Sequence, residues 1–174
     1  VGLVAQVPGV DDLAMTTNGH LLADLARPLR EAGLQRLNVS IDTLDAAQFA
    51  RTTRLGSLAD VLAGLDAADA AGFRHTKLNA VVQRGANDTH LVALADFAAS
   101  RGYVLRLIEH MPIGTDEAWT PASFVPRSRL GIRRRSASLV GPWMQSTGQT
   151  ATQDWSFTPM HASVITNGIW AAPT

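Results

Sequence analysis

Strand-like and helix-like segments alternate between residues 13 and 111, and this alternation limits the possible folds more than any other feature of the sequence. Segments typical of β-strands are predicted at 13–18, 36–42, 76–82 and 103–109. Helices are predicted near 20–32, 46–51, 57–71 and 89–101. Alternating strands and helices indicate right-handed βαβ units, so the sequence predicts an α/β fold with a parallel sheet, either a barrel or an open doubly wound sheet.

The predicted helices differ in how clearly their limits can be seen. Segment 57–71 is the clearest, because apolar residues recur at helical spacing and Gly72 follows as a stop signal. Pro28 predicts a kink or a break in the first of these helices. Asn87 or Asp88 is predicted to be the N-cap of the helix at 89–101.

The predicted strands carry polar residues on one face. Period-two alternation separates the apolar side chains of 36–42 from Asn38, Ser40 and Asp42. The polar positions of the other strands are Thr16, Asn18, Lys77, Asn79 and Arg106, with Glu109 at the end of the last strand. Parallel strands buried on both faces are usually apolar throughout, and an unpartnered buried polar group costs a few kcal/mol. We therefore expect a polar lumen that binds a polar ligand; the alternative is a network of buried side chains that satisfy one another.

Composition excludes several classes of function. The 15 Lys and Arg residues balance 15 Asp and Glu residues, so a strongly basic nucleic-acid-binding protein is not expected. No apolar run reaches the roughly 20 residues of a membrane span, and the first residues do not resemble a signal peptide, so a cytoplasmic protein is expected. The chain has no cysteine, which excludes disulfides and cysteine-held iron–sulfur clusters within it. The histidines show no metal-binding spacing.

The βα pattern fades after residue 118. Five arginines lie between residues 127 and 135, where they form either a phosphate or nucleic-acid patch or a solvated helix face. The sequence therefore divides into an α/β part at 1–118 and a segment at 119–174 that begins a C-terminal region.

Four motifs in this order carry a family resemblance: TTNG at 16–19, LNVSIDTLD at 37–45, FRHTKLN at 73–79 and RLIEHMPIG at 106–114. Together they resemble the molybdenum cofactor biosynthesis protein A family, the GTP 3′,8-cyclases of the radical S-adenosylmethionine (SAM) superfamily. The resemblance is dense from about residue 8 to 120. It implies a partial (βα) barrel of radical SAM type, whose four strands are equivalent to the third to sixth strands of an incomplete TIM-like barrel.

The resemblance also implies roles for individual residues. Ser40 and Met111 correspond to contacts with S-adenosylmethionine, and Thr16 and Lys77 correspond to contacts with GTP. Arg106, Asn79 and Asn18 are further candidates for the lumen.

The family converts GTP to (8S)-3′,8-cyclo-7,8-dihydroguanosine 5′-triphosphate by means of a 5′-deoxyadenosyl radical, in molybdenum cofactor biosynthesis. Its cofactors are S-adenosylmethionine and two [4Fe-4S] clusters, and it works upstream of cyclic pyranopterin monophosphate synthase. The cluster cysteines are missing here, so we expect an internal fragment that is inactive on its own. The resemblance is compatible with a homodimer. The alternative is a non-catalytic half-barrel that binds a nucleotide or a partner.

Overall fold

A computed structural model of the chain describes residues 1–53, 56–111 and 120–126. Its elements are, in chain order, α1 (Gly2–Ala5), β1 (Ala14–Thr17), α2 (Leu22–Glu31), β2 (Arg36–Ser40), α3 (Ala46–Thr52), α4 (Leu58–Ala70), β3 (Lys77–Val82), the 3₁₀ turn η1 (Asp88–His90), α5 (Leu91–Ser100) and β4 (Val104–Glu109). The arginine cluster at 127–135 and the rest of the C-terminal region after residue 126 lie outside the described residues.

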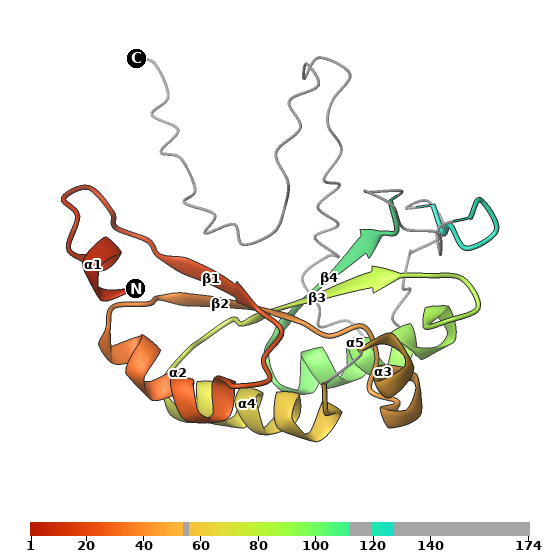
Figure 1. Cartoon of the computed structure of the whole chain (residues 1–174), viewed down its shortest axis with the longest axis horizontal. Helices are drawn as coiled ribbons and strands as arrows, with labels where there is room; N and C mark the ends of the chain where they lie inside the picture. Colours follow the sequence, from red (N-terminus) through yellow and green to blue (C-terminus); the bar gives the residue numbers. More distant parts are fainter. Residues whose placement is uncertain (54–55, 112–119, 127–174) are drawn as a thin grey trace, which may run out of the picture.

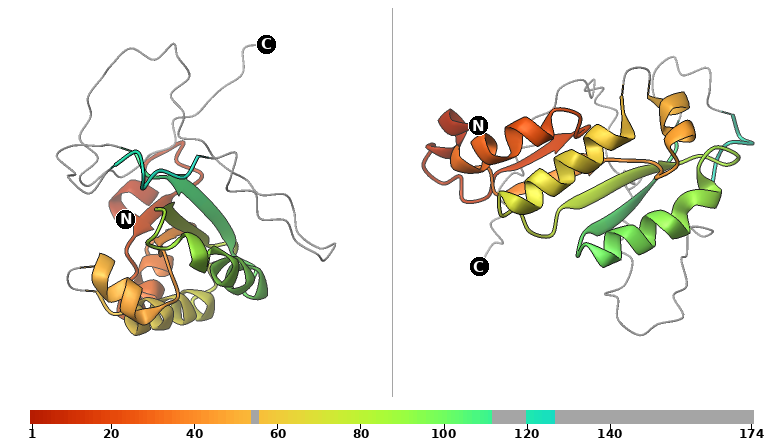
Figure 2. Two further views of the ribbon diagram at one scale, coloured as in Figure 1. Left: turned by 90° about the vertical axis from the view of Figure 1, so that its right-hand side faces the viewer. Right: turned by 90° about the horizontal axis from the view of Figure 1, so that it is seen from below.

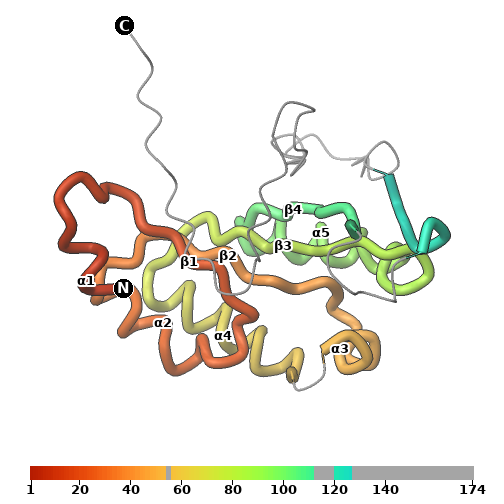
Figure 3. The backbone as a smooth tube through the Cα atoms, turned by 45° about the horizontal axis from the view of Figure 1, so that its top comes forward, coloured from red at the N-terminus to blue at the C-terminus, as the bar shows by residue number. Residues whose placement is uncertain are grey.

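The four strands form one parallel sheet in the order β1-β2-β3-β4 (Figure 1). Strands that are consecutive in the chain are therefore neighbours in the sheet, as the tube in Figure 3 also shows. A doubly wound sheet reverses its strand order at a switch point, and these four strands do not. The α/β prediction is confirmed, and the strand order is that of a partial (βα) barrel.

The long helices all cover one face of the sheet. Helices α2, α4 and α5 lie below the strands in Figure 1 and cross in front of them when the molecule is seen from that side (Figure 2, right). No described helix lies on the opposite face. Within the described ranges, no helix is both long and apolar enough to cross a membrane.

The fully buried apolar residues of β2 and β3 point toward the helices, whereas Val81, Val104 and Ile108 share the opposite face with Lys77 and Arg106. The predicted apolar face of β2 is buried, with Leu37 1% and Val39 0% exposed, and Ile41 just beyond the strand is 1% exposed. On β3 the apolar positions Leu78, Ala80 and Val82 are fully buried. Burial of one such side chain stabilises the fold by about 1.5–3 kcal/mol, so the helix-facing side of the sheet is the main source of stability.

Helices α2 and α4 approach each other closely at Gly64. A Cβ atom at Gly64 would lie 2.7 Å from the carbonyl oxygen of Gly19 and 2.9 Å from Cβ of Leu22. Gly19 itself has a φ of +79°, which glycine adopts without strain. The glycine of the TTNG motif thus makes the turn after β1, and Gly64 leaves room for that turn.

Two local predictions need correction. Helix α2 continues through Pro28, so the predicted break is wrong. Proline in a helix removes one main-chain hydrogen bond, and the buried residues Leu22 and Ala26 anchor α2 to the core. The N-cap predicted for the last helix is only partly right: Asn87 is the N-cap of the 3₁₀ turn η1 that leads into α5, but the N-cap of α5 itself is His90, and neither position has a side-chain capping hydrogen bond.

Candidate functional site

The strand register arranges the polar residues in two rows across the sheet. The first row contains Thr16, Asn38 and Lys77, which are paired in that order from β1 to β3. The second row contains Ser40, Asn79 and Arg106, from β2 to β4. Neighbouring strands are about 4.8 Å apart, so adjacent members of a row are within side-chain reach of each other. We call these six residues the open face.

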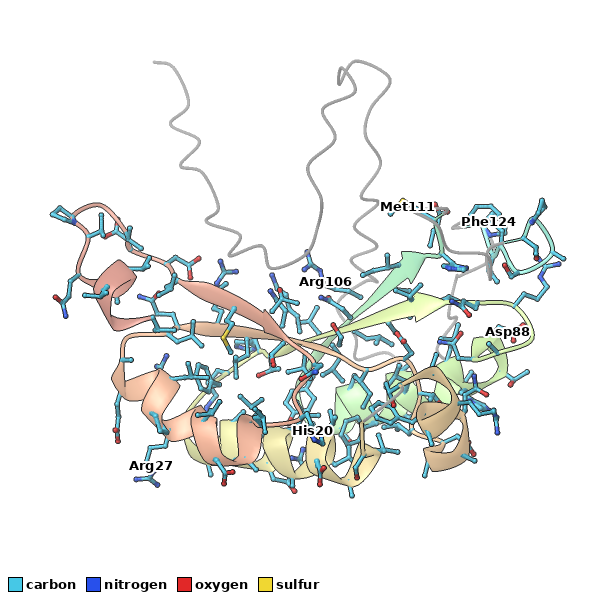
Figure 4. The ribbon with its side chains drawn as sticks, viewed as in Figure 1. His20, Arg27, Asp88, Arg106, Met111 and Phe124 are labelled. Carbon is cyan, nitrogen blue, oxygen red and sulfur yellow. The ribbon has the colours of Figure 1, made fainter. Side chains whose placement is uncertain are left out.

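The open face points away from the helices. In Figure 4, Arg106 extends from the strands on the side opposite to His20 and Arg27, which lie on the helix side. Thr16 and Ser40 are exposed, whereas Lys77, Asn79 and Arg106 are half-buried. These polar groups are therefore accessible from the side of the sheet that no described helix covers.

Hydrogen bonds satisfy only part of the open face. Nδ2 of Asn38 donates to Oγ1 of Thr16 at 3.2 Å. Oδ1 of Asn79 is buried but has no hydrogen-bond partner among the described residues. An unpartnered buried acceptor costs about 1–3 kcal/mol. The side chains of the open face thus do not form a fully self-satisfied network, which leaves room for a polar ligand.

Positive charge collects around Lys77. Burial, and then repulsion from Arg106 and Arg36, hold the pKa of the Lys77 ammonium below its usual value, and Asp12 partly opposes this. Within the described ranges neither Lys77 nor Arg106 has an ion-pair partner. Arg36 is paired: its Nε donates to Oδ1 of Asp12 at 2.7 Å and its Nη2 donates to Oδ2. The positive charges near Lys77 thus exceed the negative charge available from Asp12.

Side chains join β2 and β3 at their carboxyl ends. Nδ2 of Asn87 donates to the main-chain oxygens of Asp42 and Val81 at 2.9 and 2.8 Å, and its Oδ1 accepts from the N–H of Gln83 at 2.8 Å. Oδ1 of Asp42 accepts from the N–H of Val81 at 2.8 Å. Asn87 is buried, and these bonds hold the chain beyond Ser40 against β3. Burial raises the pKa of the Asp42 carboxyl, and the Val81 hydrogen bond partly offsets this.

The loop after β2 and the turn after β3 are also joined by side-chain contacts. Oγ1 of Thr43 lies 2.8 Å from Nδ1 of His90 and accepts a hydrogen bond from the N–H of Asp45 at 3.0 Å. Thr43 is fully buried. The loop from β2 to α3 is thereby fixed to the turn that precedes α5, at the edge of the sheet where (βα) barrels place their sites.

The predicted site residues fall into separate positions. Thr16 and Lys77 share the first row, and Ser40 lies in the second row, at the carboxyl end of β2. Met111 lies just beyond the carboxyl end of β4, apart from both rows (Figure 4). Asn18 follows β1, where its Oδ1 accepts a hydrogen bond from the N–H of His20 at 3.2 Å.

Sequence reasoning missed two features of this site. Arg36 shares its face with Asn38 and Ser40, so the same alternation could have placed it there. Asn87 was expected to cap a helix, and its bonds to residues 42 and 81 depend on the tertiary fold. No local pattern in the sequence indicates such a contact.

One family model matches more than half of the chain. The model of the Radical SAM superfamily matches residues 3–98, a span that contains the first three strands and the helices packed on them. The chain belongs to the radical SAM superfamily. The barrel type predicted from the four motifs is thereby confirmed.

The individual relatives indicate one type of enzyme within this superfamily. A GTP 3′,8-cyclase from Acidothermus cellulolyticus is 48% identical over 143 residues, which are 82% of this chain and 40% of that protein. GTP 3′,8-cyclase 1 from Pseudomonas aeruginosa is 55% identical over 111 residues, which are 64% of this chain and 34% of that protein. A GTP 3′,8-cyclase from Pseudomonas putida is 52% identical over 113 residues. This radical SAM chain thus resembles GTP 3′,8-cyclases, and it spans 34–40% of the length of the first two.

The superfamily implies S-adenosylmethionine and an iron–sulfur cluster, and the residues present fit only the first. The chain has no cysteine, and the described residues contain no group of three His, Asp or Glu side chains that could hold a metal ion. A cluster bound by thiolates therefore has no ligands here. A polar organic ligand does fit, because the open face offers the exposed hydroxyls of Thr16 and Ser40 and the half-buried cations Lys77 and Arg106.

Proposed function

We propose that this chain provides the part of a cytoplasmic GTP 3′,8-cyclase that binds and orients GTP and S-adenosylmethionine. The observation that carries the proposal is the pair of half-buried cations on the open face, Lys77 and Arg106, neither of which has an ion-pair partner among the described residues. Two like charges held close together raise the free energy of the empty face, and a bound anion would lower it. The polyphosphate of a nucleotide is such an anion, and relatives at 48–55% identity bear the name of an enzyme that acts on GTP.

The positions of these residues suggest that GTP and S-adenosylmethionine bind to different parts of the open face and its edge. Lys77 and Thr16 lie in the first row, where the ammonium would bind phosphate oxygens and the hydroxyl would donate one hydrogen bond. Ser40 and Met111 lie at carboxyl ends of strands, where the hydroxyl and the thioether would contact S-adenosylmethionine. The Asn87 and Asp42 hydrogen bonds fix the main chain just beyond Ser40. The chain would thus orient its two ligands on one rigid surface.

The full activity requires more than these residues. S-adenosylmethionine supplies the radical chemistry in this superfamily when a cluster is present, and the cluster ligands are not among the 174 residues. We propose that the complete enzyme acts before cyclic pyranopterin monophosphate synthase in molybdenum cofactor biosynthesis and forms a homodimer. A second candidate function, nucleotide binding without turnover, is favoured by one observation, the absence of every cysteine from the chain.

Two equilibrium titrations on the full chain test the binding proposal, one with GTP and one with S-adenosylmethionine. Lys77→Ala should weaken GTP binding by roughly 1.5–3 kcal/mol, the range for a hydrogen bond to a charged group. It should change S-adenosylmethionine binding far less, and Ser40→Ala should show the opposite preference. Arg27→Ala is the matched control, because Arg27 is exposed on α2 on the helix side of the sheet (Figure 4).

Three results would contradict the proposal. The first is a parent chain that binds neither ligand. The second is a Lys77→Ala variant with unchanged GTP affinity and a strongly reduced melting temperature, which would make Lys77 a structural residue. The third is an equal loss of GTP affinity in Lys77→Ala and Arg27→Ala, which would show only nonspecific attraction of the anion.

A further inference from the structure

We propose that Arg36 is an additional anion-binding residue of the open face, which acts with Lys77 and Arg106 on the polyphosphate of the nucleotide. This inference rests on the proposed function and adds a residue that the four sequence motifs do not assign to any ligand. It depends on three observations: the position of Arg36, its bond to Asp12, and the local excess of positive charge.

The position of Arg36 places it beside Lys77. Arg36 is the first residue of β2 and pairs with Ala14, and Asn38, two residues further, pairs with Lys77. Arg36 and Asn38 therefore share a face of the sheet. One strand spacing and two residues of rise separate the Cα atoms of Arg36 and Lys77 by roughly 8 Å, which two long side chains readily span. The three cations thus come from three adjacent strands, with Lys77 on the middle one.

The bond to Asp12 holds Arg36 without using all of its donors. Asp12 accepts from Nε and Nη2 of the guanidinium, which has five N–H groups in all. The other N–H groups have no partner among the described residues. The side chains of Arg36 and Asp12 are 37% and 53% exposed, so an anion in solution can reach the free donors. Asp12 thus fixes the plane of the guanidinium and leaves one side of it available.

The electrostatic effects on Lys77 support the placement of Arg36 near Lys77 and Arg106. Both Arg36 and Arg106 lower the pKa of Lys77, which shows that the three charges share one region, and Asp12 is the acidic group that opposes them. Around Lys77 these cations outnumber Asp12, the one carboxylate that acts on it, on a face that no described helix covers. A polyphosphate carries several negative charges and can bind to more than one of these cations at once.

A purely structural role for the pair is the competing explanation. In that case Asp12 and Arg36 only fasten the chain before β1 to the start of β2. The two explanations differ for single variants, because Arg36→Gln and Asp12→Asn break the same ion pair but change the local charge in opposite directions. A structural pair predicts similar effects of the two variants on anion binding. A binding Arg36 predicts opposite effects.

The test is calorimetric titration of the full chain with inorganic tripolyphosphate at low ionic strength. Arg36→Gln should weaken binding about fivefold or more, since it removes a charged donor that is partly exposed. Asp12→Asn should tighten binding about two- to fivefold, because it removes a repelling carboxylate. Arg36→Lys should fall between the parent and Arg36→Gln, as it keeps the charge but loses the planar fork. Arg27→Gln on α2 should stay within about twofold of the parent.

The outcomes separate this inference from the proposed function. If Lys77→Gln and Arg106→Gln weaken binding while Arg36→Gln behaves like Arg27→Gln, the nucleotide-binding face stands and the role of Arg36 is refuted. Equal shifts in the same direction for Arg36→Gln and Asp12→Asn also refute it. If the parent chain does not bind tripolyphosphate, both proposals are overturned. Far-ultraviolet circular dichroism of each variant shows whether the fold is retained, and Arg36→Lys keeps the test valid if Arg36→Gln does not fold.

Discussion

The two faces of the sheet are made by the same strands but have opposite chemistry. On β3, Leu78 and Ala80 are completely buried under the helices, whereas the alternating residues Lys77 and Asn79 are half-buried on the open face. The helix-covered face forms the buried core, and one glycine, Gly64, sets the distance between two of its helices. On the open face, two cations and one buried oxygen have no partner among the described residues. In β3, one set of alternate residues therefore stabilises the fold, and the other set faces the side on which we propose that the ligand binds.

The difference teaches how to interpret polar residues in a parallel strand. A strand buried by protein on both sides would have to satisfy each polar group internally. Here the helix-covered face contains almost no polar side chains, and the polar ones are gathered on the other face. This separation favours a solvated or ligand-filled surface over a hydrogen-bonded core.

The largest effect should come from removing a side chain of the covered face. We expect Leu78→Ala to lower the free energy of unfolding by about 2–5 kcal/mol, because it leaves a cavity under the helices. Lys77→Ala, one residue away on the open face, should change it by less than about 1 kcal/mol. Urea denaturation of both variants measures the contrast. Similar losses for the two would show that the open face is packed as tightly as the covered one.

Asn87 connects the carboxyl ends of the strands, and its removal should have the next largest effect. Asn87→Ala leaves the oxygens of Asp42 and Val81 and the N–H of Gln83 without their side-chain partner. We expect a loss of about 2–3 kcal/mol, as for a buried group left unsatisfied. Thr89→Ala, at an exposed position in the adjacent turn, is the control and should stay near the parent. Hydrogen exchange should show faster exchange of the Gln83 amide; unchanged protection there would argue against the three bonds.

Gly64 tests the spacing of the helices on the covered face. Alanine is normally the better helix former by about 1 kcal/mol. At this position, however, the added methyl group would collide with the main chain of Gly19. We expect Gly64→Ala to destabilise the chain by about 1–3 kcal/mol. A thermal melt shifted upward instead would mean that α2 and α4 are not in close contact.

The smallest effect concerns Asp42 and depends on pH. Its carboxyl has a pKa above the usual 3.8, so the folded chain holds this proton more tightly than the unfolded chain. The stability of the parent therefore falls as the pH rises from 3.8 through the raised pKa, and the loss persists at neutral pH. Asp42→Asn keeps an acceptor for the Val81 N–H and has no charge to bury. It should gain up to about 1 kcal/mol over the parent between pH 3.5 and pH 7. A gain that shrinks as the pH rises would contradict the assigned direction.

The sequence predicted those parts of the molecule that depend on local patterns. The alternation in residues 36–42 was enough to place Leu37 in the core and Ser40 on the open face, and both placements agree with the structure. The motifs were enough to indicate the superfamily. The break expected at Pro28 does not occur, because α2 runs on through it with Leu22 and Ala26 buried in the core. The partners of Asn87 could not be predicted, since the three bonds join segments that only the fold brings together.

The central claim is that the open face binds a nucleotide, and the single lysine of the chain allows a direct test of it. Lys77 is the only lysine in the sequence, so [¹³Cε]lysine incorporated during expression gives one NMR signal. A pH titration of this signal measures the pKa of Lys77. We predict a value below 10.5 in the free chain and an increase when GTP is added, because phosphate oxygens stabilise the charged form. A pKa at or above 10.5 in the free chain, unchanged by saturating GTP, would contradict the account.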